Sequence, residues 1–430
     1  MGFSFQGYMN PVKVFKFGGA SLKDIDNIKN VTNILQKYQT ESLVIVVSAM
    51  GKTTNALEDV VRAYFARDGK AFDILNQIRH NHDAVMNGLF DKSDDVYAHV
   101  NDIFVEVEWI LEDEPHDAYD YIYDQIVSVG EMVSSKIVAA YLNKIGLKTA
   151  WVDARDVLRT DETWREAVLD WEVTTINAQN VVKPLLIEGG FVMTQGFIGS
   201  TKDNNTTTLG REGSDYSAAI FAHCLDAAGM FIWKDVIGVL SGDPRVFKDV
   251  VKLDKIGYDE AIEMTYYGAT VVHPRTIQPL MAKNIPLNVR SFMEHDAPGT
   301  VISSDTEGVT YPPMLMAERN QIFLKISTKD YTFIVENHIR DLFAIFTQYH
   351  IFVNLLQNSG AYFFVSITHA PDRERELMRD IRAKFDVEEI HNLDLFTVRH
   401  PTQAVIETLK LGKRIVFEKT IPDTYQVVLG

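Results

Sequence analysis

The stretch "FVMTQGFIGSTKDNNTTTLGREGSDYSAAIFA" (191–222) decides the fold. An apolar run ends at a glycine turn, a polar hairpin follows, and a second glycine-rich turn leads into a predicted helix. Four residues begin that helix: Gly210, Gly213, Ser214 and Asp215. Helix N-termini attract anions, and the planar guanidinium of Arg211 suits a carboxylate or a phosphate. The stretch predicts an anion-binding strand–turn–helix unit, in which Asp215 is either a helix N-cap or a functional carboxylate.

The same pattern occurs near the N-terminus, in "VKVFKFGGAS" (12–21). A predicted strand ends in Gly18-Gly19 and is followed by a helix. Adjacent glycines allow successive backbone N–H groups to form an anion-binding concavity. Lys16 stands two residues before Gly18 and could meet a transferring phosphoryl group as a point charge. By itself the stretch favours a tight strand–helix turn with a solvated lysine.

A third glycine turn, "VVSAMGKTTN" (46–55), ends like a Walker A phosphate loop. That loop needs a glycine five residues before its Gly-Lys pair, and Val46 occupies this position. A β-branched residue inside the apolar run 43–47 cannot form the open turn that surrounds phosphates. We therefore exclude a P-loop and predict a buried strand that turns into a helix from about Asn55.

A fourth stretch, "MFIWKDVIGVLSGDPRVF" (230–247), combines a predicted strand with polar loop residues. Asp235 follows the strand, and Arg245 lies in a Gly-Asp-Pro-Arg turn. An acidic residue at a strand end and an arginine in the next loop suit the ribose and phosphates of a nucleotide. The turn alone is a common pattern and carries little weight.

Composition limits the possible functions. The 430 residues suggest two or three domains of roughly 150 residues each. The net charge of −17 argues against nucleic-acid and anionic-membrane partners. The single cysteine, Cys224, is predicted to be a core residue and excludes a disulfide within the chain. We recognise no signal peptide at the N-terminus and no membrane-spanning run, so we expect a cytoplasmic protein.

These stretches belong to an ordered set that resembles the aspartate kinases of the amino-acid kinase family, from residue 12 to about 305. The set comprises "KFGGAS", "VVSAMGKTTN", "SVGEMVSSKI", "TQGFIGS", "TTTLGREGSDYSA", "WKDVIGVLSGDPR", "YYGATVVHPRTIQPL" and "APGTVIS". The resemblance implies an α/β fold, the carbamate kinase-like αβα sandwich. It also implies ATP-dependent phosphorylation of the side-chain carboxylate of L-aspartate to 4-phospho-L-aspartate, the first step toward lysine, threonine and methionine.

The resemblance also assigns site residues. The residues implied for substrate binding are Ser48, Thr54, Glu131, Phe197, Thr208, Arg211 and Ser214. Glu131 would face the substrate ammonium, and Thr208 and Arg211 would hold its carboxylate. The residues implied for phosphoryl transfer and ATP are Lys16, Gly18, Gly19, Asp215, Asp235 and Arg245. Asp215 would organise Lys16.

The chemistry suits these residue types. A carboxylate is already a nucleophile at neutral pH, so no general base is required. The enzyme must bring two anions together, ATP and aspartate, and stabilise the charge of the transferring group. Lysine, arginine, backbone amides and Mg²⁺ supply that positive charge, so ATP and Mg²⁺ are the expected cofactors and no dedicated protein metal site is predicted.

Three positions depart from the family pattern. Glu212 stands where a second glycine is usual, Lys234 where a threonine precedes the aspartate, and Thr270 where a lysine contacts the nucleotide. Lys234 or Lys252 could supply the missing cation. These departures keep open a second interpretation, a catalytically weak regulatory subunit. A third, a kinase for glutamate, N-acetylglutamate, carbamate or UMP, is disfavoured by the block around Arg211.

The segment 56–142 has helical periodicity. Three histidines are scattered over its predicted helices and loops: His80, His82 and His116. None has an acidic or cysteine partner at metal-ligand spacing, so we predict no transition-metal site there. The acidic stretch 112–120 is expected to be a solvated helix boundary, a lid or a dimer surface.

The composition changes after residue 305. We assign residues 1–305 to the kinase domain and 306–320, with two prolines and mixed charge, to a linker. The order βαββαβ over 321–392 is ferredoxin-like and resembles an ACT domain. Residues 393–430 resemble a shortened second ACT domain, βαββ. Exposed sheet edges favour side-by-side pairing, so a homodimer or higher homo-oligomer is expected.

The effector is less clear from the sequence. Lysine-sensing members tend to have Gly-Phe, Asp and Ser-Glu where this chain has Asn337-His338, Asn354 and Ser359-Gly360. Without the carboxylate that pairs with a lysine ammonium, sensitivity to lysine is doubtful. An ACT region kept only for dimerisation is the alternative. We expect no fused homoserine dehydrogenase within these 430 residues.

Overall fold

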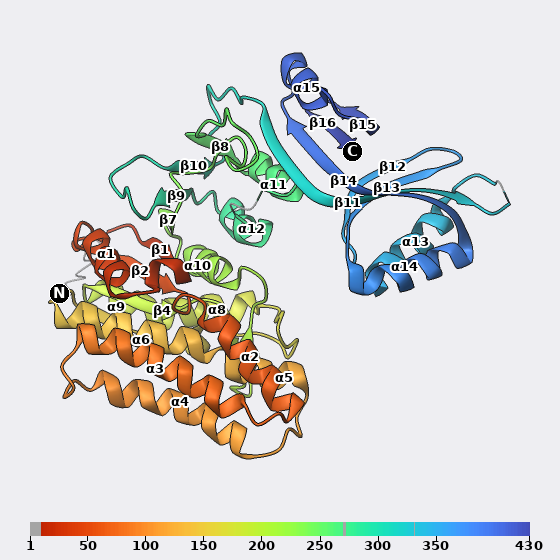
Figure 1. Cartoon of the computed structure of the whole chain (residues 1–430). Helices are drawn as coiled ribbons and strands as arrows, with labels where there is room; N and C mark the ends of the chain where they lie inside the picture. The colour runs from red at the N-terminus through yellow and green to blue at the C-terminus, as the bar shows by residue number, and fades with distance from the viewer. Residues whose placement is uncertain (1–9, 270–271, 331) are drawn as a thin grey trace. The chain divides into compact units, whose positions relative to one another are not determined.

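The computed structural model describes residues 10–269, 272–330 and 332–430 (Figure 1). The N-terminal residues 1–9, interpreted above as lacking a signal peptide, and Thr270 lie outside the described part. The chain forms two compact units. Unit 1 comprises Met1–Val239, Asp254–Tyr258 and Val272–Glu307, and unit 2 comprises Leu240–Leu253, Asp259–Val271 and Gly308–Gly430.

Unit 1 is built on an eight-stranded sheet in the order β3-β4-β2-β1-β7-β9-β10-β8. The strands are β1 Lys13–Phe17, β2 Leu43–Val47, β3 Thr149–Trp151, β4 Phe191–Gln195, β7 Gly229–Lys234, β8 Lys255–Gly257, β9 Leu287–Ser291 and β10 Thr300–Ser303. All neighbouring pairs are parallel except β9 and β10. Parallel strands are buried on both faces, which is why β2 reads Leu-Val-Ile-Val-Val and is fully buried.

Helices follow the strands along unit 1. They are α1 Ile25–Gln36, α2 Thr53–Ala66, α3 Ala71–Leu89, α4 Val96–Glu112, α5 Tyr119–Val127, α6 Val129–Lys144, α7 Ala154–Val157, α8 Trp171–Asn177, α9 Lys183–Ile187, α10 Gly213–Cys224 and α12 Pro274–Ala282. A 3-10 turn (Gly19–Leu22), a π turn (Ala178–Val182) and the hairpin β5 Ile198–Ser200 and β6 Thr206–Thr208 complete it. The predicted helical segment 56–142 is confirmed by α2 to α6. Cys224 is buried, as predicted. Within the described residues, no helix has the length and apolarity to span a membrane.

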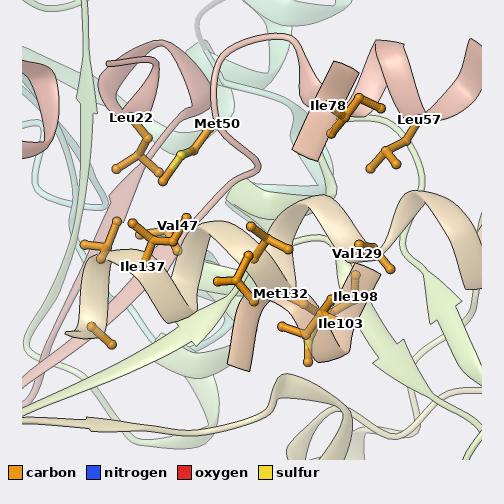
Figure 2. Close-up of a cluster of buried hydrophobic side chains, with 14 of the residues drawn as sticks. Leu22, Val47, Met50, Leu57, Ile78, Ile103, Val129, Met132, Ile137 and Ile198 are labelled. Carbon is orange, nitrogen blue, oxygen red and sulfur yellow. The ribbon is translucent and has the colours of Figure 1, made fainter. Parts of the chain in front are cut away.

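The main core of unit 1 lies on one face of the sheet. Phe15 and Phe17 of β1 point into it and meet apolar side chains of α1, α2, α3, α4 and α6. Figure 2 shows Val47 of β2, Leu57 of α2 and Met132 of α6 within this cluster. Helix α6 is buried around most of its circumference, and α4 packs beside it (Figure 1). Helix α10 instead contacts β1, β2 and β7.

The register of the sheet brings four loops to one edge. Phe17 of β1 pairs with Val47 of β2 and Trp233 of β7, and Val47 pairs with Gln195 of β4. Ligands of open α/β sheets bind outside the carboxyl ends of parallel strands. The loops that follow β1, β2, β4 and β7 are therefore where the site should lie.

Unit 2 contains a six-stranded antiparallel sheet in the order β12-β13-β11-β14-β16-β15. Its strands are β11 Met314–Thr328, β12 Val353–Asn358, β13 Phe363–Thr368, β14 Phe385–Arg399, β15 Ile415–Ile421 and β16 Thr424–Leu429, and its helices are α13 Glu336–Gln348, α14 Pro371–Lys384 and α15 Gln403–Lys410. Helix α11 (Tyr258–Tyr266) belongs mainly to this unit. The element order agrees with the predicted βαββαβ and βαββ, and the long strand β14 serves both halves.

The predicted domain limits stay a prediction. Residues 314–320, placed in the linker from the sequence, form the first part of β11. The compact units also divide the chain differently, because residues 240–253 and 259–271 group with unit 2. Segment 240–253 is joined to unit 2 by Phe247, which packs on Phe396 of β14.

Candidate functional site

Two lysines converge on one buried carboxylate at the sheet edge of unit 1. Lys16 Nζ, from the end of β1, lies 2.5 Å from Oδ1 of Asp215 in the first turn of α10. Lys234 Nζ, from the end of β7, lies 3.4 Å from Oδ2 of the same residue. Lys16 and Asp215 are almost completely buried, whereas Lys234 is half-buried. Three segments far apart in the sequence thus form one charged cluster.

The cluster combines two lysines with a single carboxylate. Burial alone would favour the neutral form of Asp215, but Lys16 and then Lys234 outweigh it and lower the pKa of this carboxyl below its ordinary value. Two lysine side chains therefore face one ionised carboxylate. Such a site suits an anion.

Glycines let the loops after β1 and β2 approach each other closely. A Cβ on Gly19 would lie 2.7 Å from the carbonyl oxygen of Ala49, and the N–H of Gly51 donates to the Gly19 oxygen at 2.9 Å. A Cβ on Gly18 would lie 3.4 Å from Lys16 Nζ, so this glycine borders the charged cluster. The predicted anion-binding turn thus lies directly beside the predicted lysine.

Glu131, in the first turn of α6, is a buried carboxyl with an incomplete set of partners. Its Oε1 accepts from the N–H of Ala49 at 3.2 Å, whereas its Oε2 is buried and has no hydrogen-bond partner within the described residues. Burial raises the pKa of Glu131 to about 8, although the Ala49 N–H and the charge of Lys16 act in the opposite direction. A buried acceptor of this kind is costly unless a ligand satisfies it.

Phe197 and Ser214 come together where the loop after β4 meets the start of α10. A Cβ on Gly196 would lie 2.6 Å from Ser214 Cβ, and a Cβ on Gly213 would lie 2.7 Å from Phe197 Cδ2. Phe197 has φ 72° and its N–H donates to Ser217 Oγ at 2.9 Å. The glycines in both predicted motifs are therefore needed for this close contact.

Ser48 and Thr54 lie on the loop and helix that follow β2. The Ser48 N–H donates to the Phe17 oxygen at 3.1 Å, and the Ser48 oxygen accepts from Ser134 Oγ at 2.7 Å. Thr54 is the second residue of α2 and is half-buried. Ser48 directly precedes Ala49, whose N–H binds Glu131, whereas Thr54 lies five residues further along the chain.

Thr208 uses both of its donors on Asp124. Its hydroxyl donates to Oδ1 at 2.6 Å and its N–H to Oδ2 at 3.0 Å. Burial raises the pKa of Asp124 to about 6, although the hydrogen bonds of Thr208 act in the opposite direction. Asp124 was missed in the sequence, where an acidic residue on the apolar face of a helix was the available signal. The role of Thr208 in binding a carboxylate stays a prediction that this contact does not favour.

Arg211 stands exposed in the turn before α10, four residues before Asp215. In the described parts of the chain its guanidinium makes no ion pair or hydrogen bond, which leaves its donors available. Its neighbour Glu212 has φ 54°, in the left-handed region that favours glycine. The glycine that the family usually has at this position would adopt the same backbone conformation without steric cost.

The predicted nucleotide contacts fall in different units. Asp235 follows β7 in unit 1 and is exposed. Arg245 lies in unit 2 and holds Asp243, with Nε 3.0 Å from Oδ1 and Nη2 2.7 Å from Oδ2. Lys252 also belongs to unit 2. The assignment of Asp235 and Arg245 to ATP stays a prediction, and Lys234 contacts Asp215, the residue that also pairs with Lys16.

Comparison with known sequences identifies relatives. The profile of the amino acid kinase family matches residues 11–291. Lysine-sensitive aspartokinase 3 of Escherichia coli is 34% identical over 361 residues, which cover 82% of this chain and 77% of that protein. The bifunctional aspartokinase/homoserine dehydrogenase 1 of Arabidopsis thaliana chloroplasts is 35% identical over 67% of this chain. The matched region spans about a third of that relative's length, 32%.

Solved structures agree with these sequences. The crystal structure of E. coli aspartokinase III with lysine and aspartate has a TM-score of 0.83 at 27% identity and covers 97% of this chain and 95% of that chain. The structure of the same protein with aspartate and ADP has a TM-score of 0.81 at 27% identity, with 97% and 96% covered. The predicted α/β kinase fold with a C-terminal antiparallel regulatory region is confirmed.

Proposed function

Because this chain belongs to the aspartate kinases of the amino-acid kinase family, we propose that it transfers the γ-phosphoryl group of ATP to the side-chain carboxylate of L-aspartate. The products would be ADP and 4-phospho-L-aspartate. A relative that binds aspartate and ADP supports this choice of substrates. The loops at the carboxyl ends of β1, β2, β4 and β7 would form the active site.

The proposal rests on one observation: a buried carboxyl oxygen that needs a hydrogen-bond donor lies near lysines that attract an anion. Within the described residues, Glu131 has a buried oxygen without a hydrogen-bond donor, and two lysines, Lys16 and Lys234, meet nearby at Asp215. An amino acid suits both parts of the site, because its ammonium can donate a hydrogen bond to Glu131 while its carboxylate approaches the lysines. An anion without a hydrogen-bond donor would leave Glu131 unsatisfied.

In the proposed mechanism a side-chain carboxylate oxygen of aspartate attacks the γ-phosphorus, and the bond to the bridging oxygen of ADP breaks. Lys16 and the N–H groups around Gly18 would stabilise the charge on the transferring oxygens. Asp215 holds Lys16 and Lys234 in place without itself moving a proton, since its pKa is lowered. Arg211 would bind the α-carboxylate of the substrate.

Mg²⁺ fits this chemistry as the partner of ATP. This ion prefers a few carboxylates together with substrate phosphates, and the exposed carboxylate of Asp235 at the end of β7 is available to hold it. Bound there, Mg²⁺ would offset the charge of the phosphates. Activity should therefore disappear when the metal is chelated and return when Mg²⁺ is added.

A coupled assay of ADP release tests the proposal. We expect release on addition of L-aspartate and ATP, and little release with L-glutamate, whose extra methylene moves the reacting carboxylate. Equal rates with both amino acids would contradict the assigned substrate. No release with any amino acid would favour the second interpretation, a regulatory subunit.

We also propose that an amino acid regulates the enzyme through unit 2, as the lysine-sensitive relative suggests. Asn354 of β12, where an acidic residue is usual, donates to Gln321 Oε1 at 2.9 Å and to Thr368 Oγ1 at 2.8 Å. An amide there offers no charge to a lysine ammonium. Titration of the kinase assay with lysine, threonine and methionine would identify the effector, and no response to any of them would contradict the proposal.

Assembly and location are likewise proposals. The strands β12 and β15 are the edges of the antiparallel sheet and suit pairing with a second copy, so a homodimer or larger is expected. Light scattering during gel filtration would test this, and a monomeric mass would contradict it. A cytoplasmic location agrees with the single buried cysteine, although some relatives are chloroplastic.

A further inference from the structure

Three potential metal ligands converge in unit 2, far along the sequence from the kinase motifs. His369 follows β13, Glu374 lies in the first turn of α14, and His391 lies in β14. One ligand atom from each residue lies within 4.8 Å of the other two. His369 is exposed, and the other two residues are half-buried.

The central carboxylate lacks an ordinary partner. Glu374 Oε2 is buried and lies 2.6 Å from His369 Nδ1, yet it makes no well-formed hydrogen bond in the described part of the chain. Its other oxygen lies 3.7 Å from His391 Nδ1. A carboxylate between two imidazole nitrogens, without hydrogen bonds that satisfy it, is the arrangement a shared cation would complete.

The backbone is shaped to present these side chains. The pairing of β11 with β14 shifts register on both sides of Gln321, opposite the part of β14 that contains His391. Asn320 and Asn392 both have positive φ at this bulge, 54° and 58°. The N–H of His369 donates to the oxygen of Asn320 at 2.8 Å. Bulges re-aim side chains and occur often beside functional sites.

A second carboxylate lies behind one of the histidines. His391 Nε2 is 3.7 Å from Glu389 Oε2, and Glu389 is held by Arg382 Nη2 at 2.7 Å. Metal-binding histidines usually direct their other ring nitrogen to a carboxylate, which fixes the tautomer and the ring orientation. Here the nitrogen that faces Glu374 is left to serve as the ligand.

We propose that His369, Glu374 and His391 bind a divalent transition-metal ion of the Zn²⁺ class, with water in the remaining position. Two imidazoles and one carboxylate suit Zn²⁺, Co²⁺ or Ni²⁺, whereas Mg²⁺ and Ca²⁺ prefer oxygen ligands. Zinc bonds of about 2.0–2.2 Å place tetrahedral ligand atoms about 3.3 Å apart. The contacts of 2.6 and 3.7 Å bracket that spacing. The ion would join the end of β13, α14 and β14.

This site is separate from the Mg²⁺ of the proposed kinase reaction and does not depend on it. The sequence alone predicts no metal site in unit 2. His369 and His391 are 22 positions apart, and only the fold of unit 2 brings them together.

Cobalt titration of the untagged, metal-stripped full chain tests the proposal. Visible absorption of Co²⁺ should saturate at one ion per chain, and one equivalent of Zn²⁺ should abolish it, while excess Mg²⁺ should not. His369→Ala, Glu374→Gln and His391→Ala should each weaken binding at least about 100-fold, and Glu389→Gln about 10–100-fold. Matched controls are Glu376→Gln, an exposed residue of α14, and His99→Ala, an exposed residue of unit 1; both should bind like the unaltered chain.

Thermal unfolding gives an independent readout that also verifies folding. Zn²⁺ should raise the Tm of the unaltered chain and leave that of Glu374→Gln unchanged, while both show a cooperative transition without metal. If the cluster consists of ion pairs only, Co²⁺ will not bind stoichiometrically. That result, equal competition by Mg²⁺, or unchanged affinity in a folded Glu374→Gln variant would overturn the proposal.

Discussion

The two units contain buried ion clusters with opposite character. In unit 2, both oxygens of Glu260 receive hydrogen bonds from Arg399, 2.9 Å from Nε and 2.7 Å from Nη2, and the remaining Nη1 donates to Thr424. In unit 1, two lysines share the single carboxylate of Asp215, and Glu131 nearby has a buried oxygen that receives no hydrogen bond from the residues that the structure describes.

The difference separates structural charges from functional ones. Burial disfavours ionisation of Glu260, yet its hydrogen bonds and Arg399 lower its pKa, so the pair is complete without a ligand. Glu131 has its pKa raised by burial because nothing compensates it fully. Strongly perturbed, incompletely paired groups mark sites that await a ligand, and the variants below test this contrast.

Removal of Lys16 should have the largest effect on activity. Lys16→Met takes one positive group from the transferring phosphoryl group, and kcat should fall about 10²–10³-fold, by analogy with the loss of one donor to a developing charge. Lys13→Met is the matched control, since Lys13 is three residues earlier in β1 and pairs with Glu41 near the surface. Steady-state kinetics measure both; equal losses in the two variants would contradict the role of Lys16.

Breaking the complete pair should instead affect stability. Arg399→Met leaves Glu260 buried without its partner and should lower the free energy of unfolding by about 2–4 kcal/mol, with kcat little changed at low temperature. Removal of both partners in Arg399→Met/Glu260→Gln should recover part of the loss. Urea unfolding of the full chain measures this, with Lys325→Met, which breaks the more exposed pair with Glu388, as a control expected within about 1 kcal/mol.

Replacement of Glu131 should raise the KM for aspartate. At pH 8 and above, where Glu131 is ionised, Glu131→Gln removes a charged acceptor for the substrate ammonium, and a loss of about 1.5–3 kcal/mol corresponds to about 10–150-fold in KM. Ser134→Ala, which removes a nearby hydrogen bond on α6, should change KM much less. An unchanged KM in Glu131→Gln would show that the ammonium binds elsewhere.

The raised pKa of Glu131 predicts the direction in which stability and the KM for aspartate change with pH. Its pKa is about 8 in the folded chain against 4.5 as the reference value, so the folded state holds a proton that the unfolded state releases. Stability should therefore fall as the pH rises from 4.5 to about 8, and Glu131→Gln should remove this slope. As the pH rises toward 8, the KM for aspartate should decrease, because only the ionised carboxylate of Glu131 attracts the substrate ammonium. If Glu131→Gln showed the same pH profiles of stability and KM as the unaltered chain, the role assigned to Glu131 would be refuted.

The smallest effect is expected at Lys234. Because its side chain is partly exposed, Lys234→Ala should raise the KM for ATP only about 3–10-fold. Lys255→Ala, which removes a surface ion pair with Asp305, serves as the control. If the KM for ATP does not rise, Lys234 is not the cation that replaces the lysine usually found at position 270.

Much of the site followed from local sequence. The glycine turns after β1 and β4, the first turn of α10 and the elements of unit 2 could all be predicted, because turns, helix starts and apolar periodicity are local properties. The partners of individual side chains could not. Nothing near Thr208 in the sequence indicated that Asp124 would take both of its donors.

By itself, the sequence determined the family, the strand–glycine–helix units and the presence of a lysine and a carboxylate at their ends. Only the tertiary structure decided that Lys16 and Lys234 share Asp215 and that two distant histidines meet at Glu374. It also decided that one oxygen of Glu131 has no hydrogen-bond partner among the described residues. The reason is physical: backbone conformation depends on neighbours along the chain, whereas the charge state of a buried group depends on neighbours in space.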